Sequence, residues 1–238
     1  MTSPLFLLPA ALAILGCDTK EGESIDLPAF DAFSTNVTSY IDGDEYVIET
    51  NGLPDHTSPY WSPSHDLYVE PTVADDVAPG YIDDFSGSYT LRVPSEPEVA
   101  SSSSSTGLGA IGIAVSGAVI YNDEEGPNVP IDGAILSLDY TGAHTGPQSY
   151  HYHLEPTAWS EDDDALIGII SDGFFLYGRK CSSTGDYPTD LDASGGHTAT
   201  TQHSDEALYH YHIQNELYLS QYYILFPGDY QGTPNTVQ

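Results

Sequence analysis

Short apolar runs, bounded by Gly, Pro or acidic residues, recur along the chain after residue 40. They are rich in Ile, Val, Leu and Tyr, and none continues long enough for the amphipathic period of a helix. Residues 46–48 and 89–93 have this character and predict strands in the first part of the chain. The pattern therefore predicts a mainly β fold with long loops and little helix.

The same pattern of positions occurs twice. Three pairs of segments follow one another in the same order: 111–121 with 167–177, 138–145 with 191–198, and 150–153 with 209–212. Each unit contains an apolar strand, a turn Gly, a second apolar strand ending in Tyr, an Asp-x4-His segment and a final Tyr-His-Tyr-His word. A repeat of this kind is best sought before any other interpretation of a fold. We expect two pseudo-duplicated β units packed together.

Composition divides the chain into segments. The predicted order is a signal peptide over 1–16, an acidic tether over 17–40 and one domain over 41–238. That domain divides further into an N-terminal β region (41–93), a Ser-rich loop (94–107), a first repeat unit (108–158) and a second repeat unit (165–220). A run of Ser between two strand-rich regions is typical of a flexible connection.

The apolar stretch at the N-terminus is too short to cross a bilayer as a helix and is typical of a signal peptide. Residues 14–17 resemble a bacterial lipobox, which predicts lipidation of Cys17, although no Lys or Arg precedes the apolar run. We therefore expect an exported protein anchored by lipid at the cell envelope, or otherwise secreted. Cys181 would then be the only other thiol, so no disulfide is expected. No repeat partner supports Cys181 as a site residue.

The charge of the chain excludes some classes of partner. It has 36 acidic and four basic residues, a formal net charge of −32. A surface of this sign repels nucleic acid phosphates and anionic lipid, so a lipid anchor would be the only contact with the membrane. Adaptation to salty surroundings and binding of divalent cations both account for such a charge. An extracellular polymer is a further candidate partner.

The Tyr-His-Tyr-His words carry the candidate chemistry. Alternate residues of a strand point to one face, so each word places two imidazoles on one side and two phenols on the other. A His-x-His pair on a strand suits Zn, Cu, Fe or Mn. The candidate metal ligands are the paired members of the two units: Asp139, His144, His151, His153, Asp192, His197, His210 and His212.

Other interpretations of these residues remain open. Each Asp could orient an imidazole instead of binding metal directly. Clustered His and Tyr side chains could also form a buried hydrogen-bond network that pins two hairpins together. The chain has no Gly-x-Ser-x-Gly elbow, no Walker or dinucleotide glycine motif and no His-Glu-x-x-His, so these enzyme templates are excluded.

The chain resembles the YHYH-domain family over about residues 45–234. The resemblance is carried by segments 51–56, 172–178 and 191–197 together with the second Tyr-His-Tyr-His word. It implies an exported protein of a group without an established common activity. The turn that ends in His56 belongs to the shared pattern, so the resemblance adds His56 to the candidate ligands.

These observations predict an exported surface protein with a duplicated His/Asp centre that binds a transition metal. Two alternatives stay open. One is a metal-dependent hydrolase or oxidase acting on extracellular polymers. The other is a non-catalytic adhesion or matrix module in which the His-Tyr clusters are structural.

Overall fold

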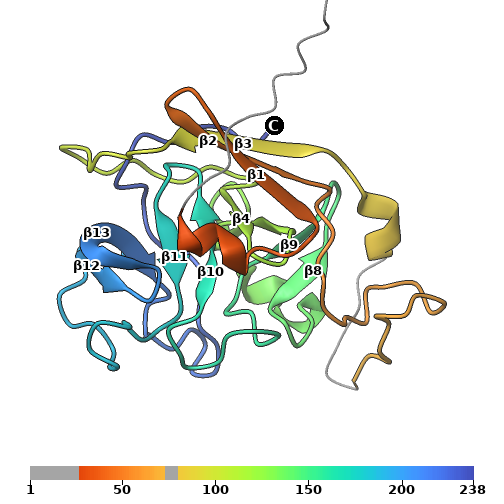
Figure 1. Cartoon of the computed structure of the whole chain (residues 1–238). Coiled ribbons are helices and arrows are strands. Elements are labelled where there is room, and N and C mark those ends of the chain that lie inside the picture. Colours follow the sequence, from red (N-terminus) through yellow and green to blue (C-terminus); the bar gives the residue numbers. More distant parts are fainter. Residues whose placement is uncertain (1–26, 73–79) are drawn as a thin grey trace, which may run out of the picture.

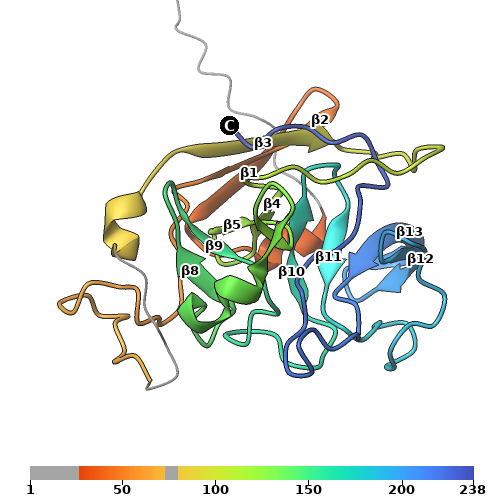
Figure 2. The same ribbon diagram turned by 180° about the vertical axis from the view of Figure 1, so that it is seen from behind.

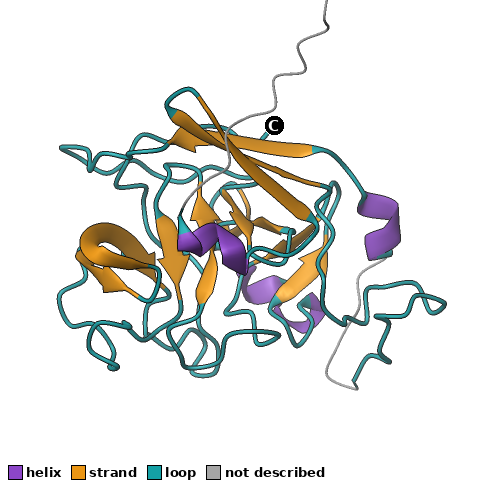
Figure 3. Cartoon of the chain, viewed as in Figure 1, coloured by secondary structure: helices purple, strands orange, loops and turns teal. Residues whose placement is uncertain are grey.

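A computed structural model describes residues 27–72 and 80–238 of the chain. The predicted signal peptide and the predicted lipidation site Cys17 lie outside these residues. Strands and loops dominate the fold (Figure 3), which confirms the prediction of a mainly β protein. The helical segments of the described part are short 3-10 turns: η1 (Pro28–Ala32), η2 (Ile82–Phe85), η3 (Ile131–Gly133) and η4 (Ile135–Ser137). No helix in this part of the chain is long and apolar enough to cross a membrane.

A three-stranded antiparallel sheet lies across one end of the molecule (Figure 1). Its strands are β1 (Val37–Asp42), β2 (Glu45–Thr50) and β3 (Tyr89–Pro94), in the order β1-β2-β3. Its apolar side chains pack on the middle of the larger sheet in one buried cluster, formed by Phe30, Ile48, Leu91, Val93, Ile113 and Ile169. The smaller sheet therefore covers one face of the larger one.

The larger sheet has eight strands in the order β12-β13-β11-β10-β4-β5-β9-β8. The strands of its first half are β4 (Gly112–Ala114), β5 (Val119–Ile120), β8 (Ala143–Thr145) and β9 (Tyr150–Tyr152). Those of its second half are β10 (Leu166–Ile170), β11 (Phe175–Tyr177), β12 (Gly196–Thr201) and β13 (Ser204–His212). Every residue of β10 is buried, as expected for a strand covered on both faces.

The two halves of this sheet have the same pattern of strand pairing. Each begins with an antiparallel hairpin, β4–β5 or β10–β11. The second strand of each hairpin pairs in parallel with the strand that carries the Tyr-His-Tyr-His word. That strand pairs in turn with an antiparallel edge strand, β8 or β12.

The halves meet where β4 pairs with β10. The two halves therefore lie edge to edge in one sheet. The strand pairs β8–β9 and β12–β13, each of which includes a strand with a Tyr-His-Tyr-His word, lie at opposite sides of the molecule (Figure 2). The origin of the halves in a duplication stays a prediction.

The turn glycines of the repeat close the two central hairpins. Gly117 has φ +102° and Gly173 has φ +95°, a backbone region that side chains with a Cβ rarely adopt. A polar residue precedes each glycine, Ser116 before Gly117 and Asp172 before Gly173. These two polar residues occupy equivalent positions in the two units. The hydroxyl of Tyr211 donates to Asp172 over 2.5 Å.

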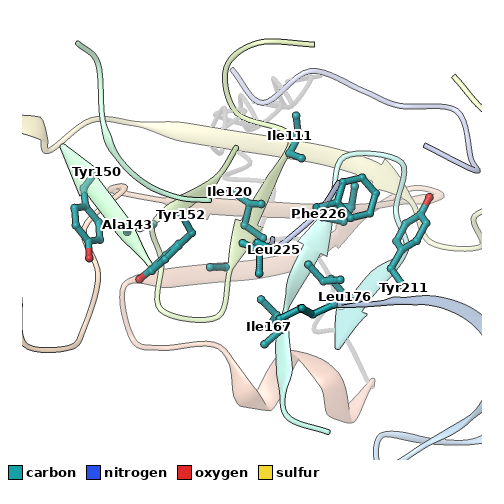
Figure 4. Close-up of a cluster of buried hydrophobic side chains, with 14 of the residues drawn as sticks. Ile111, Ile120, Ala143, Tyr150, Tyr152, Ile167, Leu176, Tyr211, Leu225 and Phe226 are labelled. Carbon is teal, nitrogen blue, oxygen red and sulfur yellow. The ribbon is translucent and has the colours of Figure 1, made fainter. Parts of the chain in front are cut away.

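The main core lies on the tyrosine face of the larger sheet. Tyr150, Tyr152 and Tyr211 are completely buried, and Figure 4 shows them at the two ends of a cluster that has Ile120 and Leu176 between them. A core on this side fixes which face of each Tyr-His-Tyr-His word points inward. The imidazoles consequently project from the opposite face of the strands.

The Ser-rich loop between the sheets is held by the C-terminal segment. Ser104 and Tyr230 exchange backbone hydrogen bonds of 2.9 and 2.8 Å, and the Ala100 amide donates to the Gln231 carbonyl over 2.7 Å. Composition predicted a flexible connection here. The backbone pairing with a segment that is distant in sequence was not visible in that composition.

Candidate metal centres

The first group of imidazoles, which we call the first cluster, comprises His144 from β8 and His151 and His153 from β9 and the residue after it. All three side chains are buried. The Nε2 atoms of His144 and His151 are 3.0 Å apart. A carboxylate joins them from β6 (Glu124–Gly126), which pairs with β7 (Val129–Pro130). The Oε1 atom of Glu125 lies 3.3 Å from His144 Nε2 and 3.4 Å from His153 Nε2.

Two backbone carbonyls fix the tautomer of the His-x-His pair in the first cluster. The Nδ1 atom of His153 lies 2.6 Å from the Asn122 carbonyl oxygen, and that of His151 lies 3.2 Å from the Ser149 carbonyl oxygen. A carbonyl can only accept, so Nδ1 carries the proton in both rings. Each Nε2 atom therefore presents a lone pair to the centre of the cluster.

His144 is oriented by a hydroxyl. Its Nδ1 atom lies 2.8 Å from Ser137 Oγ, which itself donates to the Ala134 carbonyl over 2.7 Å. Since the only hydroxyl proton is used in that second bond, Ser137 accepts from His144 Nδ1–H. The third imidazole of the first cluster thus also turns an unprotonated Nε2 inward.

The second cluster has the same construction with a thiol in place of the carboxylate. It comprises Cys181, His197 from β12, and His210 and His212 from β13, all buried. The Nε2 atoms of His210 and His212 are 3.1 Å apart, and Cys181 Sγ lies 3.5 Å from His197 Nε2. The two clusters are separate groups near opposite edges of the sheet.

The His-x-His tautomers of the second cluster are fixed as in the first. The Nδ1 atom of His210 donates to the Leu208 carbonyl over 2.9 Å, and that of His212 donates to the Gly178 carbonyl over 2.7 Å. The accepting carbonyls stand at equivalent positions in the two units. One lies two residues before the first His of the His-x-His pair, and the other lies one residue after the repeat tyrosine, Tyr121 or Tyr177.

An acid replaces the hydroxyl behind the remaining imidazole of the second cluster. His197 Nδ1 lies 2.9 Å from a carboxylate oxygen of Asp190. Asp190 stands seven residues before His197, as Ser137 stands seven before His144. A carboxylate that accepts from the outer nitrogen of a ligand imidazole orients the ring and raises its basicity.

Sequence reasoning missed both fourth groups. Glu125 was not considered, and Cys181 was set aside because no repeat partner supported it. The gapless alignment of 111–121 with 167–177 could have revealed both groups. When it is extended by four residues past Tyr121 and Tyr177, it places Glu125 opposite Cys181. The pair was overlooked because a carboxylate and a thiol do not look alike in sequence, although both are metal ligands.

The inward-facing atoms of the first cluster are all acceptors. Three imidazole lone pairs and a carboxylate oxygen meet with no proton between them, and the buried Nε2 atom of His153 has no hydrogen-bond partner. Acceptors this close repel one another unless a cation or an added proton lies between them. Ligand atoms of the three imidazoles lie within 4.8 Å of one another. Tetrahedral zinc places neighbouring ligand nitrogens about 3.3 Å apart.

Burial favours the neutral form of the four His-x-His imidazoles. It lowers the pKa of His153 and His210 to about 4 and that of His212 to about 3. Burial, followed by the neighbouring imidazoles, also lowers the pKa of His151 well below its usual value. A metal ligand must be unprotonated, so both His-x-His pairs are ready to bind a cation near neutral pH.

Residues 90–189 match the model of a family described as YHYH protein. The chain contains a YHYH-family segment. This match bears out the resemblance to the YHYH-domain family over residues 90–189, and the rest of the predicted extent, about 45–234, stays a prediction. The segment holds the complete first cluster and Cys181, and it ends before the second Tyr-His-Tyr-His word. No curated protein and no solved structure matches the chain.

The predicted ligand Asp139, within the YHYH-family segment, lies outside both clusters. It accepts from the Thr141 amide over 2.8 Å, from the Tyr150 hydroxyl over 2.8 Å and from Ser58. It therefore shapes the turn before β8 and anchors a core tyrosine on the face opposite the imidazoles. The structure does not bring the Asp139 carboxylate into the first cluster.

The predicted ligand Asp192 has the equivalent place in the second unit. It accepts from the amides of Ser194 and Gly196 over 2.9 and 3.1 Å and from the Tyr209 hydroxyl over 2.9 Å. The Asp-x4-His spacing thus describes a turn that delivers the His, and its carboxylate does not reach the cluster. The structure does not bring Asp192 into the second cluster.

The candidate ligand His56 lies on the tyrosine face. Its Nε2 atom is 2.5 Å from the Tyr152 hydroxyl, and its Nδ1 atom donates to the Thr57 carbonyl over 2.9 Å. Because alternate residues of β9 face opposite ways, a contact with Tyr152 places His56 across the sheet from His151 and His153. The structure does not bring His56 into either cluster.

Proposed function

We propose that this protein binds one transition metal ion at the first cluster and one at the second cluster. The observation that carries the proposal is the orientation of the six imidazoles. Each Nδ1–H is donated outward to a fixed oxygen, and each Nε2 lone pair points at the other ligands. The Glu125 carboxylate and the Cys181 thiol complete four donors in each cluster.

The alternative of a structural polar network is less well supported. A network that pins two hairpins together needs alternating donors and acceptors. The first cluster has a donor deficit, since each ring has already used its proton on an outer oxygen. A cation would satisfy all four acceptors at once, which a hydrogen-bond network of these groups does not.

The donor sets favour different metals. Imidazole with carboxylate suits Zn, Fe or Mn, whereas a thiolate beside three imidazoles favours Zn or Cu. A ligand thiol loses its proton on binding, so the second cluster would release a proton as it takes up metal. Zinc is the ion that both sets accept.

Metal content tests the proposal. The protein from Asp18 onward is expected to hold two equivalents of metal by mass spectrometry after reconstitution with zinc. The variants His151→Ala/His153→Ala and His210→Ala/His212→Ala should each hold one. His65→Ala, which removes an imidazole stacked on Trp61 away from both clusters, is the matched control and should hold two. A folded parent that stays empty after exposure to Zn, Cu, Fe and Mn would overturn the proposal.

We further propose export and lipid anchoring, on the basis of the apolar segment before Cys17. The strongly acidic chain makes binding to nucleic acid or to anionic lipid through the folded part unfavourable. Labelling of cells with a radioactive fatty acid should mark the parent and leave the Cys17→Ser variant unmarked. Equal labelling of both would show that Cys17 is not the attachment point.

A further inference from the structure

A cavity of about 450 Å³ borders the first cluster. Its lining includes His144, His151, His153, Glu125 and Tyr121. Tyr121 stacks on His151 with ring centroids 3.9 Å apart, so an aromatic wall continues from the cluster into the cavity. This volume falls in the range of small-molecule sites. All four donors of the cluster therefore adjoin a space that can hold a ligand.

The fourth donor of the first cluster is accessible. The side chain of Glu125 is 29% exposed, whereas Cys181 in the second cluster is completely buried. Glu125 lies on a hairpin that is separate from the eight-stranded sheet. In contrast, the Cys181 backbone is paired with Asp186 and the thiol contacts Ser183 and His197. The two clusters therefore differ in how closely the protein surrounds the fourth ligand, Glu125 or Cys181.

The opening beside the second cluster reaches only one of its ligands. The groove of about 560 Å³ beside it includes His210 in its lining, but neither Cys181 nor His197 nor His212. Four protein ligands without an open face are typical of a structural metal site, and an open position is typical of a reactive one.

We infer that the first cluster is the reactive centre, with an exchangeable coordination position that faces the cavity, and that the second cluster is a closed structural centre. This inference rests on the proposed metal binding. The exchangeable position takes a small electron-pair donor, either water or an oxygen of a substrate. Glu124 and Glu125 line the cavity and no Lys or Arg does, so neutral or cationic substrates fit it better than polyanions. Water held there would have a lowered pKa and could attack a bound substrate.

Cobalt(II) substitution with azide as the probe tests the inference. Cobalt reports both on coordination number, through its visible d–d bands, and on the Cys181 thiolate, through a sulfur-to-cobalt charge-transfer band. In the parent loaded with two equivalents, azide is expected to change the d–d bands and to leave the charge-transfer band unchanged. In His210→Ala/His212→Ala, which keeps the first cluster, the d–d change should be fully retained. In His151→Ala/His153→Ala it should be lost.

Each outcome is decisive. A charge-transfer band that responds to azide, or equal d–d changes in both double variants, would overturn the distinction between open and closed centres. Stoichiometric cobalt with no response to azide would also overturn it and leave the proposed metal binding intact. Failure of the folded parent to bind cobalt would remove both proposals together. The parent measurement needs no substitution, so misfolding of a variant would not leave the inference undecided.

Discussion

At the scale of single residues, the ring nitrogen that carries the proton decides which nitrogen of each His can bind a metal. The Asn122 and Gly178 carbonyls each hold an Nδ1–H of the second His in a His-x-His pair, which commits the other nitrogen to the cluster. The clusters differ chiefly in their fourth group, Glu125 or Cys181. That exchange of oxygen for sulfur should separate their metal preferences.

Cys181→Ser tests the role of the thiol. A neutral hydroxyl is a much poorer ligand than a thiolate, so the zinc affinity of the second cluster should fall by at least about tenfold. The affinity of the first cluster should not change. Competition with a chromogenic chelator measures both sites in one titration.

Ser182→Ala is the matched control for this variant, because it alters the neighbouring residue and leaves the thiol in place. In addition, alkylation of Cys181 should be slower in the zinc-loaded parent than in the metal-free parent. Unchanged zinc affinity in Cys181→Ser would exclude the thiol as a ligand.

The pH dependence of stability tests the burial of a neutral imidazole. Burial lowers the pKa of His212 to about 3, while an imidazole in the unfolded chain binds a proton near pH 6.5. The unfolded state therefore binds more protons as the pH falls below 6.5, and stability decreases. His212→Gln cannot titrate, so on going from pH 7 to pH 5 the metal-free parent should lose roughly 2 kcal/mol more than the variant.

Urea unfolding in the presence of a chelator gives this difference, and the charge of the rest of the chain cancels between the two proteins. A parent and a variant that lose the same stability between pH 7 and pH 5 would show that His212 is protonated as readily in the folded protein as in the unfolded one.

At the scale of elements, the seam between β4 and β10 joins the two halves of the large sheet. Gly112 and Gly168 stand on these strands, and neither has room for a side chain. A Cβ at Gly168 would lie 2.3 Å from the Ile113 carbonyl oxygen, and one at Gly112 would lie 2.6 Å from the Ile169 carbonyl oxygen. The strands can approach this closely because both positions are glycine.

Gly168→Ala should therefore destabilise the protein by about 1–3 kcal/mol, the usual cost of overpacking a buried site. The obstacle is backbone, which cannot move aside as a flexible side chain would. Chemical denaturation of the metal-free protein measures the effect. Gly107→Ala is the control, since a Cβ there meets nothing within 4 Å. Equal stability of the two variants would contradict the close packing of the seam.

At the scale of the whole molecule, the charge is the dominant feature. The formal net charge is −32, and within residues 27–72 and 80–238 each basic side chain already lies in an ion pair. Arg92 contacts Asp42 and Glu45, while Arg179 and Lys180 share Asp162. The remaining carboxylates repel one another across the surface, which opposes the compact state.

Salt should consequently stabilise the folded protein, because it screens this repulsion. The melting temperature of the metal-free protein is expected to rise by at least about 5 °C between low salt and 1 M KCl, equivalent to roughly 2 kcal/mol for a chain of this size. Differential scanning calorimetry in the presence of a chelator measures the shift. A melting temperature that falls with KCl would mean that the ion pairs outweigh the repulsion.

The sequence by itself determined that the chain is rich in strands and that one pattern of segments occurs twice. It also determined that the imidazoles and the phenols of each Tyr-His-Tyr-His word lie on opposite faces of a strand. These follow from local alternation, which is a property of neighbouring residues. It also gave His144 and His197 as candidate ligands, because each stands at the same place in its unit before the His-x-His pair.

Only the tertiary structure decided which groups complete each cluster. Glu125 and Cys181 reach their imidazoles because parallel pairing brings β5 beside β9 and β11 beside β13. Contacts between strands that are distant in sequence produce no periodic pattern of residues in either strand, so they cannot be predicted from the local sequence. For the same reason the sequence could not show that Asp139 and Asp192 turn to the tyrosine face, or that one cluster adjoins a cavity while the other is enclosed.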